Sequence, residues 1–140
     1  MDNLTPEQRR KNMQHIRSTG TKAERLLMAE LRQRGVEFSP YDKTVMGKPD
    51  LVFAEHKVAV FVDSDFWHGN PVRYVRPKTN VEYWDKKITG NKKRDRRVNR
   101  ELKKQGWTVV RLWEYDIKHD LVGCITRVLG KLGIEATDSA

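Results

Sequence analysis

The sequence predicts one α/β domain in which a mixed central sheet is flanked by helices. Two apolar runs support this, KVAVFV at residues 57–62 and WTVVRLW at 107–113, because nearly continuous apolar runs are typical of strands buried on both faces. The charged segment 82–104 between them has a helical pattern and the length of a crossover. Another strand-like run, 49–53, precedes the first and is separated from it by a turn near Glu55. This spacing predicts a hairpin.

Helix-start signals define the first part of the chain. Thr5 begins the stretch TPEQ, with a capping residue, a proline in the first turn and a glutamine at the capping-box position. The residues 18–21 break this first helix. A second helix is predicted from Thr21, with Glu24 as its capping-box partner and an apolar stripe that includes Leu27. Gly35 ends it.

The remaining elements follow from turn residues and periodicity. Residues 36–45 are predicted as a strand interrupted by Pro40, and 70–80 as a loop rich in proline and basic residues. Gly90 and Asn91 are a candidate interruption of the helix 82–104. A last helix is predicted over 121–132. Residues 1–140 are therefore interpreted as a single domain, with a frayed tail at 133–140.

Charge and cysteine content restrict the class of protein. Lys and Arg number 28 and Asp and Glu 19, a net charge of +9. Such a balance indicates a polyanionic partner, most simply nucleic acid, although a basic protein without such a partner has the same charge. Cys124 is the sole cysteine, which excludes an internal disulfide and a multi-cysteine zinc site. We find neither a bilayer-length apolar run nor a signal-peptide core, so we expect a cytoplasmic protein.

Two acids on the predicted hairpin are candidates for metal chemistry. The turn places Asp50 roughly opposite Val62 or Asp63, within about 5 Å. A carboxylate beside another carboxylate or a carbonyl can bind Mg²⁺, which supports phosphodiester cleavage together with a base that activates water. His68 is a candidate for that base, since imidazole titrates near neutrality. On spacing alone, however, turn and surface roles for these acids are slightly favoured.

Aromatic residues follow the third strand where the chain is expected to leave the core. Phe66 and Trp67 lie between Asp65 and His68, and Trp84 lies among charged residues. Aromatic side chains among basic residues can stack on bases or wedge between them. Phe66 and Trp67 could instead be core residues. We predict that role for two further tryptophans, Trp107 and Trp113.

The residue Asp95 and the separated motifs extend this interpretation. Asp95 is either one acid in a basic helix or the partner that orients His68. The motifs are KNMQHIRSTGTKAE, GKPDLVF, VFVDSDFWHGN, EYWDKKITGN, NKKRDRR and GWTVVRLWE. In this order, over residues 10–116, they resemble the very-short-patch-repair (Vsr) mismatch endonucleases, a branch of the PD-(D/E)xK nuclease superfamily. The resemblance implies a restriction-endonuclease-like core.

The resemblance also implies roles for individual residues. The family's catalytic signature falls on Glu24, Asp50, the variable position Asp63, His68 and Asp95. It implies that Asp50 binds Mg²⁺ with the backbone carbonyl of Val62, and Asp63 is a further candidate ligand. His68 would activate water, with Asp95 behind it. The DNA-contacting residues implied are the aromatic wedge, the N-terminal arm 1–18 and mismatch contacts, namely Phe66, Trp67, Trp84, Lys11, Asn12, Met13, Lys87 and Asn91.

The chain departs from the family pattern in two places, and in a third it follows the family where the family differs from its superfamily. Asp63 stands where well-known members carry histidine, so we expect stronger metal binding and another source for the leaving-group proton. Those members also hold a structural zinc with Cys and His, whereas Asp65, Gly69, Asn70 and Tyr115 occupy this neighbourhood here. We therefore expect no zinc, with packing or hydrogen bonds in its place. The superfamily's lysine after the second acid is missing, as in this branch, which uses histidine.

Three functions remain in order of preference. The first is a Mg²⁺-dependent endonuclease that nicks double-stranded DNA 5′ to the thymine of T·G mismatches left by deamination of 5-methylcytosine. The second is a homing or restriction-type nuclease that cuts matched DNA, and the third is a DNA-binding module without activity. For the first we expect a monomer of bacterial or phage type at the nucleoid, with other mismatch-repair proteins as candidate partners and no membrane association.

Overall fold

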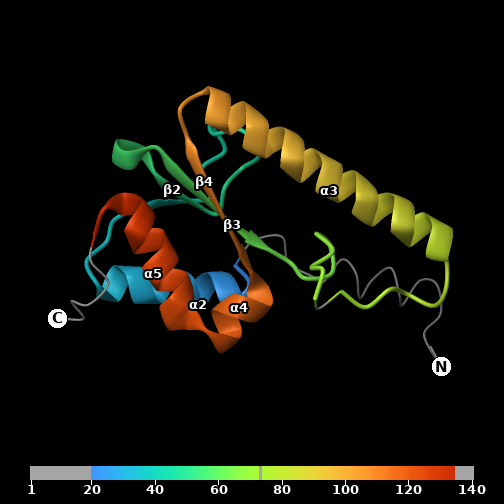
Figure 1. The fold of residues 1–140 in the computed structure, drawn as a ribbon. Coiled ribbons are helices and arrows are strands. Elements are labelled where there is room, and N and C mark those ends of the chain that lie inside the picture. The colour runs from blue at the N-terminus through green and yellow to red at the C-terminus, as the bar shows by residue number, and fades with distance from the viewer. Residues whose placement is uncertain (1–19, 73, 135–140) are drawn as a thin grey trace.

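The structure, a computed structural model, describes residues 20–72 and 74–134. In this part of the chain, four strands form a sheet in the order β1-β2-β3-β4 (Figure 1). They are β1 (Ser39–Pro40), β2 (Leu51–Phe53), β3 (Val58–Asp63) and β4 (Thr108–Trp113). Strands β1 and β3 are antiparallel to β2, and β3 and β4 are parallel. The mixed sheet predicted from the sequence is confirmed.

Helices cover both faces of this sheet. On one face lies α3 (Val81–Lys104), and on the other lie α2 (Lys22–Gln33), α4 (Glu114–His119) and α5 (Leu121–Leu132) (Figure 1). The larger apolar cluster joins the sheet to α2, α4 and α5, and a smaller one joins it to α3. The flanked sheet agrees with the predicted restriction-endonuclease-like fold.

Alternation along the two parallel strands assigns side chains to each face. In β3, Val58 and Val60 belong to the larger cluster, whereas Ala59 and Phe61 belong to the smaller one beside α3. Because successive side chains of a strand point to opposite faces, Asp63 follows Phe61 onto the α3 face. The residue of β4 paired with Phe61 is Arg111. The fold therefore brings the carboxylate of Asp63 and the guanidinium of Arg111 together beneath α3.

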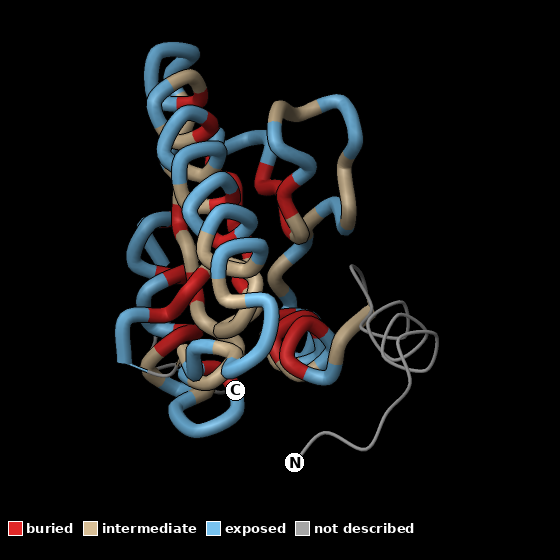
Figure 2. Tube along the Cα trace, turned by 90° about the vertical axis from the view of Figure 1, so that its right-hand side faces the viewer, coloured by how far each residue is buried: buried red, intermediate tan, exposed pale blue. Residues whose placement is uncertain are grey.

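The long helix α3 is amphipathic, with buried positions along one side (Figure 2). These are Ile88, Asn91, Val98 and Leu102. Its N-terminal half extends past the sheet, over the loop that follows β3 (Figure 1). The helix is continuous through Gly90, contrary to the candidate interruption, since Gly90 lies on the exposed side and the inward Asn91 side chain is hydrogen bonded.

Several boundaries differ from those predicted. The strand expected at 36–45 is reduced to β1, because Pro40 lacks a backbone donor and Tyr41 has a φ of 52°. The turn of the hairpin is a 3₁₀ helix, η1 (Ala54–His56), which ends at Lys57 with left-handed backbone. The short helix α4 was not predicted.

The two tryptophans predicted in the core have different environments. Trp107 is partly buried against the cluster beneath α3. Trp113 is half-buried and lies outside both apolar clusters of the described residues, because β4 ends there and the chain turns into α4.

Parts of both ends of the chain lie outside the residues that the structure describes. The predicted first helix lies outside the described residues, as do positions 135–140 of the predicted tail. Gly133 is described and ends α5 with a φ of 73°. Among the described helices, we find none with the length and apolar character needed to cross a membrane.

Candidate active site

Asp50 lies directly before β2 and is held against β3. Its backbone N–H donates to the carbonyl of Val60 at 2.9 Å, and its side-chain Oδ2 accepts from the N–H of Val62 at 2.6 Å. These two bonds place the carboxylate beside Val62, although the strand register pairs Leu51 with Val60, one residue away from the pairing predicted from the turn. The position is therefore fixed by backbone geometry.

Glu24 approaches the same place from the first turn of α2. It forms the predicted capping box, in which its backbone N–H donates to Thr21 Oγ1 and its Oε2 accepts from that hydroxyl at 2.6 Å. Its exposed fraction is only 2%. The other oxygen, Oε1, is buried and has no hydrogen-bond partner among the described residues. Glu24 thus combines a capping role with an unsatisfied acceptor next to Asp50.

The environment of Asp50 favours a bound cation. Burial raises the pKa of Asp50 to about 8, the hydrogen bond from Val62 opposes this, and the neighbouring carboxylates Glu24 and Asp63 raise it further. Buried acids with too few donors are stabilised by a positive charge. Carboxylate and carbonyl oxygens are the ligands that Mg²⁺ prefers. The carboxylate and carbonyl oxygens present here therefore fit a magnesium ion.

His68 and Asp95 form the second half of the site. The Nδ1 atom of His68 lies 2.5 Å from Asp95 Oδ2. The turn before α3 that carries His68 is closed by its N–H, which donates to the carbonyl of Ser64 at 3.1 Å. Gly69 follows with a φ of 60°, and a Cβ atom there would lie 2.8 Å from Ile88 Cγ2. A glycine at this position lets the turn pack closely against α3.

The charges around His68 favour its protonated form. Burial lowers the pKa of His68, but the hydrogen bond to Asp95 and the charges of Asp63 and Asp95 outweigh that effect, while Arg111 opposes them. The net result is a pKa above the ordinary 6.5. An imidazole held in this way can accept a proton from water near neutral pH.

Asp63 faces Arg111, which the sequence analysis did not identify. Asp63 is 4% exposed, and its Oδ1 accepts from Arg111 Nη1 at 3.0 Å. Burial raises the pKa of Asp63, and the charge of Arg111 opposes that rise. The available signal was a single arginine inside the apolar run WTVVRLW, because a charge in a buried strand needs a partner.

Two cavities of the described structure, each of about 460 Å³, expose these groups. Asp50, Asp63 and Asp95 line one, and Glu24 lines the other. Val62, His68 and Arg94 line both. The proposed metal ligands and the proposed base therefore share one accessible region.

The predicted wedge residues form an aromatic cluster next to this region. Ring centroids of Phe66, Trp67 and Trp84 are 5.3 to 5.6 Å apart, and Tyr83 lies 5.0 Å from Trp84. The first three residues are half-buried, and Tyr83 is 60% exposed. The cluster lies outside both apolar clusters of the described structure. Its rings are available for contact with a ligand above the loop and the start of α3.

The predicted mismatch contacts differ in exposure. Lys87 is exposed and lines the cavity that contains Glu24. Asn91 lines the same cavity, but it is 9% exposed and its Nδ2 donates to the carbonyl of Trp67 at 2.9 Å. Asn91 therefore holds the loop that carries Phe66 and Trp67 against α3. Lys11, Asn12 and Met13 lie outside the described residues.

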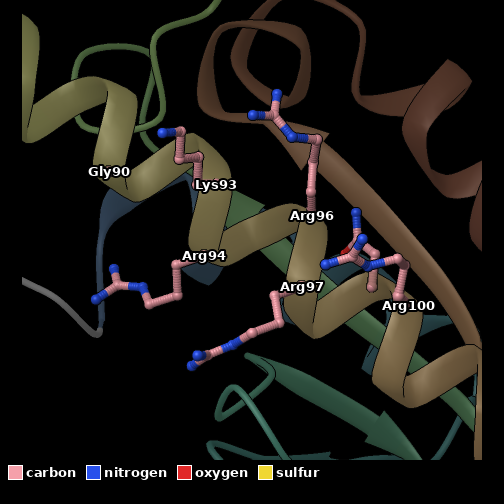
Figure 3. Close-up of a pocket in the computed structure, with 7 residues that line it drawn as sticks. Gly90, Lys93, Arg94, Arg96, Arg97 and Arg100 are labelled. Atoms are coloured by element: carbon pink, nitrogen blue, oxygen red, sulfur yellow. The ribbon is translucent and has the colours of Figure 1, made fainter.

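The outer side of α3 is strongly basic. Figure 3 shows basic side chains that extend away from the helix. They line a depression of about 780 Å³. The cations that line it are Lys93, Arg94, Arg96, Arg97 and Arg100. Since Arg94 also lines both active-site cavities, this basic surface is continuous with the site. Phosphate groups are the natural ligands of such a surface.

The region expected to lack zinc is closed by hydrogen bonds. Asn70 is 4% exposed, and its N–H and Nδ2 donate to the carbonyl and Oδ1 of Asp65 at 2.8 and 2.9 Å. Its Oδ1 accepts from the N–H of Val72 at 3.0 Å. A carboxylate and an amide engaged with each other do not fit the thiolate and imidazole set that structural zinc uses.

The chain is similar in sequence to known DNA endonucleases. The sequence profile of the family described as "DNA mismatch endonuclease Vsr" matches residues 1–73. The chain is 42% identical to the Type II nicking enzyme V.NmeDIP of Neisseria meningitidis serogroup C, over 91% of this chain and 88% of that protein. It is 41% identical to V.HpaIIP of Haemophilus parainfluenzae, over 84% and 85%. It is 36% identical to the DNA mismatch endonuclease Vsr of Escherichia coli, over 76% and 69%.

Proposed function

The chain belongs to the Vsr family of DNA mismatch endonucleases and is itself a DNA endonuclease, and from this premise we propose that it nicks duplex DNA 5′ to the thymine of T·G mispairs with Mg²⁺ as its cofactor. The nick would begin very short patch repair of deaminated 5-methylcytosine, in the cytoplasm of a bacterial cell. One observation supports this most. Val62 and His68 line both cavities, of which one contains Glu24 and the other contains Asp50 and Asp95.

Asp50 and the carbonyl of Val62 would hold the cation, with Glu24 beside them. The orphaned Oε1 of Glu24 and the raised pKa of Asp50 support this assignment. When bound, Mg²⁺ supplies positive charge against the charge that develops on the phosphate oxygens. Asp63 is a weaker candidate for a ligand, because its Oδ1 already accepts from Arg111.

His68 would remove the proton from the attacking water. Asp95 accepts from Nδ1 and thereby leaves Nε2 as the basic nitrogen. Asp95, which is partly buried, would also stabilise the imidazolium that forms. The water would then attack phosphorus, the bond from phosphorus to the 3′ oxygen would break, and that oxygen would take up a proton from solvent.

Binding of the duplex would use two surfaces. The basic side of α3 contacts phosphates, and Arg94 connects that surface to the cavities. The cluster of Phe66, Trp67 and Trp84 would enter the mismatched step, because a weakly paired step costs less to unstack. Lys87 lines the cavity that contains Glu24 and would contact the mispair or its phosphates.

A second candidate is nicking of correctly paired DNA. It is favoured by the names of the two Neisseria and Haemophilus relatives, which are called Type II nicking enzymes. The chemistry would be the same, and the target would be a recognition sequence without a mispair.

A strand-resolved nicking assay separates the two candidates. Duplexes with T·G, T·A or C·G at one position carry a different fluorophore on each strand and are incubated with Mg²⁺ or with EDTA. The proposal predicts one nick, 5′ to the thymine of the T·G duplex, in Mg²⁺ alone. Equal cutting of the paired duplexes would support the second candidate, and cutting in EDTA would remove magnesium from the mechanism.

A further inference from the structure

Arg111 is held in place by two residues other than its acidic partners. Its guanidinium carbon lies 4.1 Å from the ring centroid of Phe61, and its Nε donates to Asn99 Oδ1 at 2.8 Å. The side chain is 19% exposed. Because the guanidinium is planar and its donors form a rigid fork, stacking on Phe61 and the bond to Asn99 define where the remaining nitrogens point.

One of these nitrogens lies between two carboxylates. Arg111 Nη1 is 3.0 Å from Asp63 Oδ1 and 3.6 Å from Asp95 Oδ1. The other oxygen of Asp95, Oδ2, accepts from His68 Nδ1. Arg111 and His68 therefore contact different oxygens of Asp95, so that the carboxylate is oriented from both ends.

The same group of residues has the spacing of a metal site. Ligand atoms of Asp63, His68 and Asp95 lie within 4.8 Å of one another. Here, however, the shared Asp63 oxygen accepts from Arg111 and also lies 3.9 Å from His68 Nδ1. The guanidinium provides positive charge to the buried Asp63 carboxylate and to the partly buried Asp95 carboxylate. A metal ion is not needed to balance this group.

We propose that Asp63 and Arg111 are a positioning pair, which fixes the Asp95 carboxylate and through it the tautomer and orientation of His68, and that Asp63 is not a magnesium ligand. The inference rests on the proposed nicking function. It assigns the variable family position a role that depends on an arginine of the neighbouring strand. Phe61 and Asn99 support Arg111, which orients Asp95 and finally His68.

The kinetic test uses Asp63→Asn, Arg111→Met and the double variant, with Lys131→Met as a control that removes one distant exposed charge. We expect each single substitution to lower kcat for T·G nicking about 10- to 100-fold with little change in KM for DNA, as for other residues that orient a site. The double variant should be no slower than the slower single variant, because the two residues act as one unit. Arg111→Lys, which keeps the charge but loses the fork, should have an intermediate rate.

The magnesium dependence distinguishes positioning from ligation. We expect the Mg²⁺ concentration for half-maximal nicking by Asp63→Asn to equal that of the wild type. Asp50→Asn, which removes an assigned ligand, should raise it at least about tenfold. A comparable rise in Asp63→Asn would identify Asp63 as a ligand and overturn the proposal.

A readout without catalysis uses the ring nitrogens of His68 in metal-free protein. ¹⁵N NMR of the wild type should show His68 protonated on Nδ1 at a pH where the ring is neutral, with the signal assigned by its loss in His68→Ala. Arg111→Met should give a mixture of the two tautomers, and Lys131→Met should not. Should Arg111→Met be poorly folded by thermal unfolding, the double variant is used, since it removes the Asp63 carboxylate together with the arginine that lies 3.0 Å from it.

The outcomes separate the two claims. Wild-type rates together with an unchanged His68 spectrum in the variants would overturn the positioning pair. A wild-type protein that nicks no DNA would contradict the proposed function, whereas a shift of tautomer in Arg111→Met would still support the pair.

Discussion

Nδ1 of His68 lies 2.5 Å from Oδ2 of Asp95, although the two residues are 27 positions apart in the sequence. An ionised carboxylate can only accept a hydrogen bond. The ring therefore donates from Nδ1, and Nε2 carries the lone pair that can take a proton from water. This contact joins the loop after β3 to α3 and determines which nitrogen would act as the base in the proposed mechanism.

Replacement of Asp95 by asparagine should slow nicking. The amide can donate as well as accept, so the ring is no longer restricted to one tautomer, and the imidazolium loses a counter-charge. We expect kcat to fall about 10- to 100-fold with unchanged DNA affinity. Single-turnover nicking measures this, with Glu101→Gln as the matched control for an exposed acid of α3. A wild-type rate in Asp95→Asn would contradict the role of Asp95.

The pH profile of nicking should report the raised pKa of His68. In the proposed mechanism the neutral ring is the base, and the pKa of His68 lies above 6.5 because Asp95 and Asp63 favour the imidazolium. Activity should therefore decline on the acidic side at a midpoint above 6.5. In Asp95→Asn the midpoint should move to lower pH, since the hydrogen bond to a carboxylate is lost. An unchanged midpoint in that variant would show that another group controls the profile.

Asp50 should make the metal-free protein less stable as the pH rises. Its folded-state pKa is about 8 against an ordinary 3.8, so the folded state binds the proton more tightly and loses stability between these values. Without metal at pH 8, Asp50→Asn should be more stable than the wild type by about 1–2 kcal/mol, or roughly 2–8 °C in Tm. The difference should disappear near pH 4.

Magnesium should stabilise the wild type in the same thermal experiment and leave Asp50→Asn nearly unchanged, because a ligand that binds the folded state raises its stability. Equal stabilisation of both proteins would place the cation elsewhere.

Removal of the Trp67 ring should affect DNA distortion more than folding. The ring belongs to a half-buried cluster outside the apolar core. We expect Trp67→Ala to lose the fluorescence increase of 2-aminopurine beside a T·G pair and to unfold only a few degrees lower. Leu112→Ala, at a fully buried site, provides the comparison and should cost about 2–5 kcal/mol. A comparable loss in Trp67→Ala would assign Trp67 to the core.

The basic side of α3 should determine the salt dependence of binding. Each lost phosphate contact reduces the slope of log K against log salt by about 0.9. Substitution of Arg96, Arg97 and Arg100 by glutamine should therefore lower the slope measured on paired duplexes, with Lys131→Gln as the control. An unchanged slope would mean that the duplex does not contact this surface.

Much of the fold was predictable because its signals are local. The run KVAVFV and the turn at residues 54–56 define the hairpin, and Thr21 with Glu24 defines the start of α2. Helix α4 has six residues, with Ile117 as its buried position, too short for a periodic pattern. The strand around Pro40 is shorter than predicted, because the left-handed backbone at Tyr41 cannot be inferred from the hydrophobic pattern.

The site was predictable where motifs carry it and hidden where long-range packing decides. Asp50, His68 and Asp95 lie in short motifs, and the structure brings them together. Arg111 contacts Asp63 across 48 positions, and that contact depends on the parallel register of β3 and β4. Likewise, the burial of Asn91 beneath the Trp67 carbonyl depends on how α3 packs over the loop.

The most direct measurement is single-turnover nicking of one T·G duplex in Mg²⁺ by the wild type, Asp50→Asn and His68→Ala, with DNA binding measured on the same samples. We expect a nick 5′ to the thymine by the wild type and rates at least about 100-fold lower in both variants, which still bind the duplex. Nicking at the wild-type rate by either variant would contradict a site in which Asp50 holds the metal and His68 activates the water.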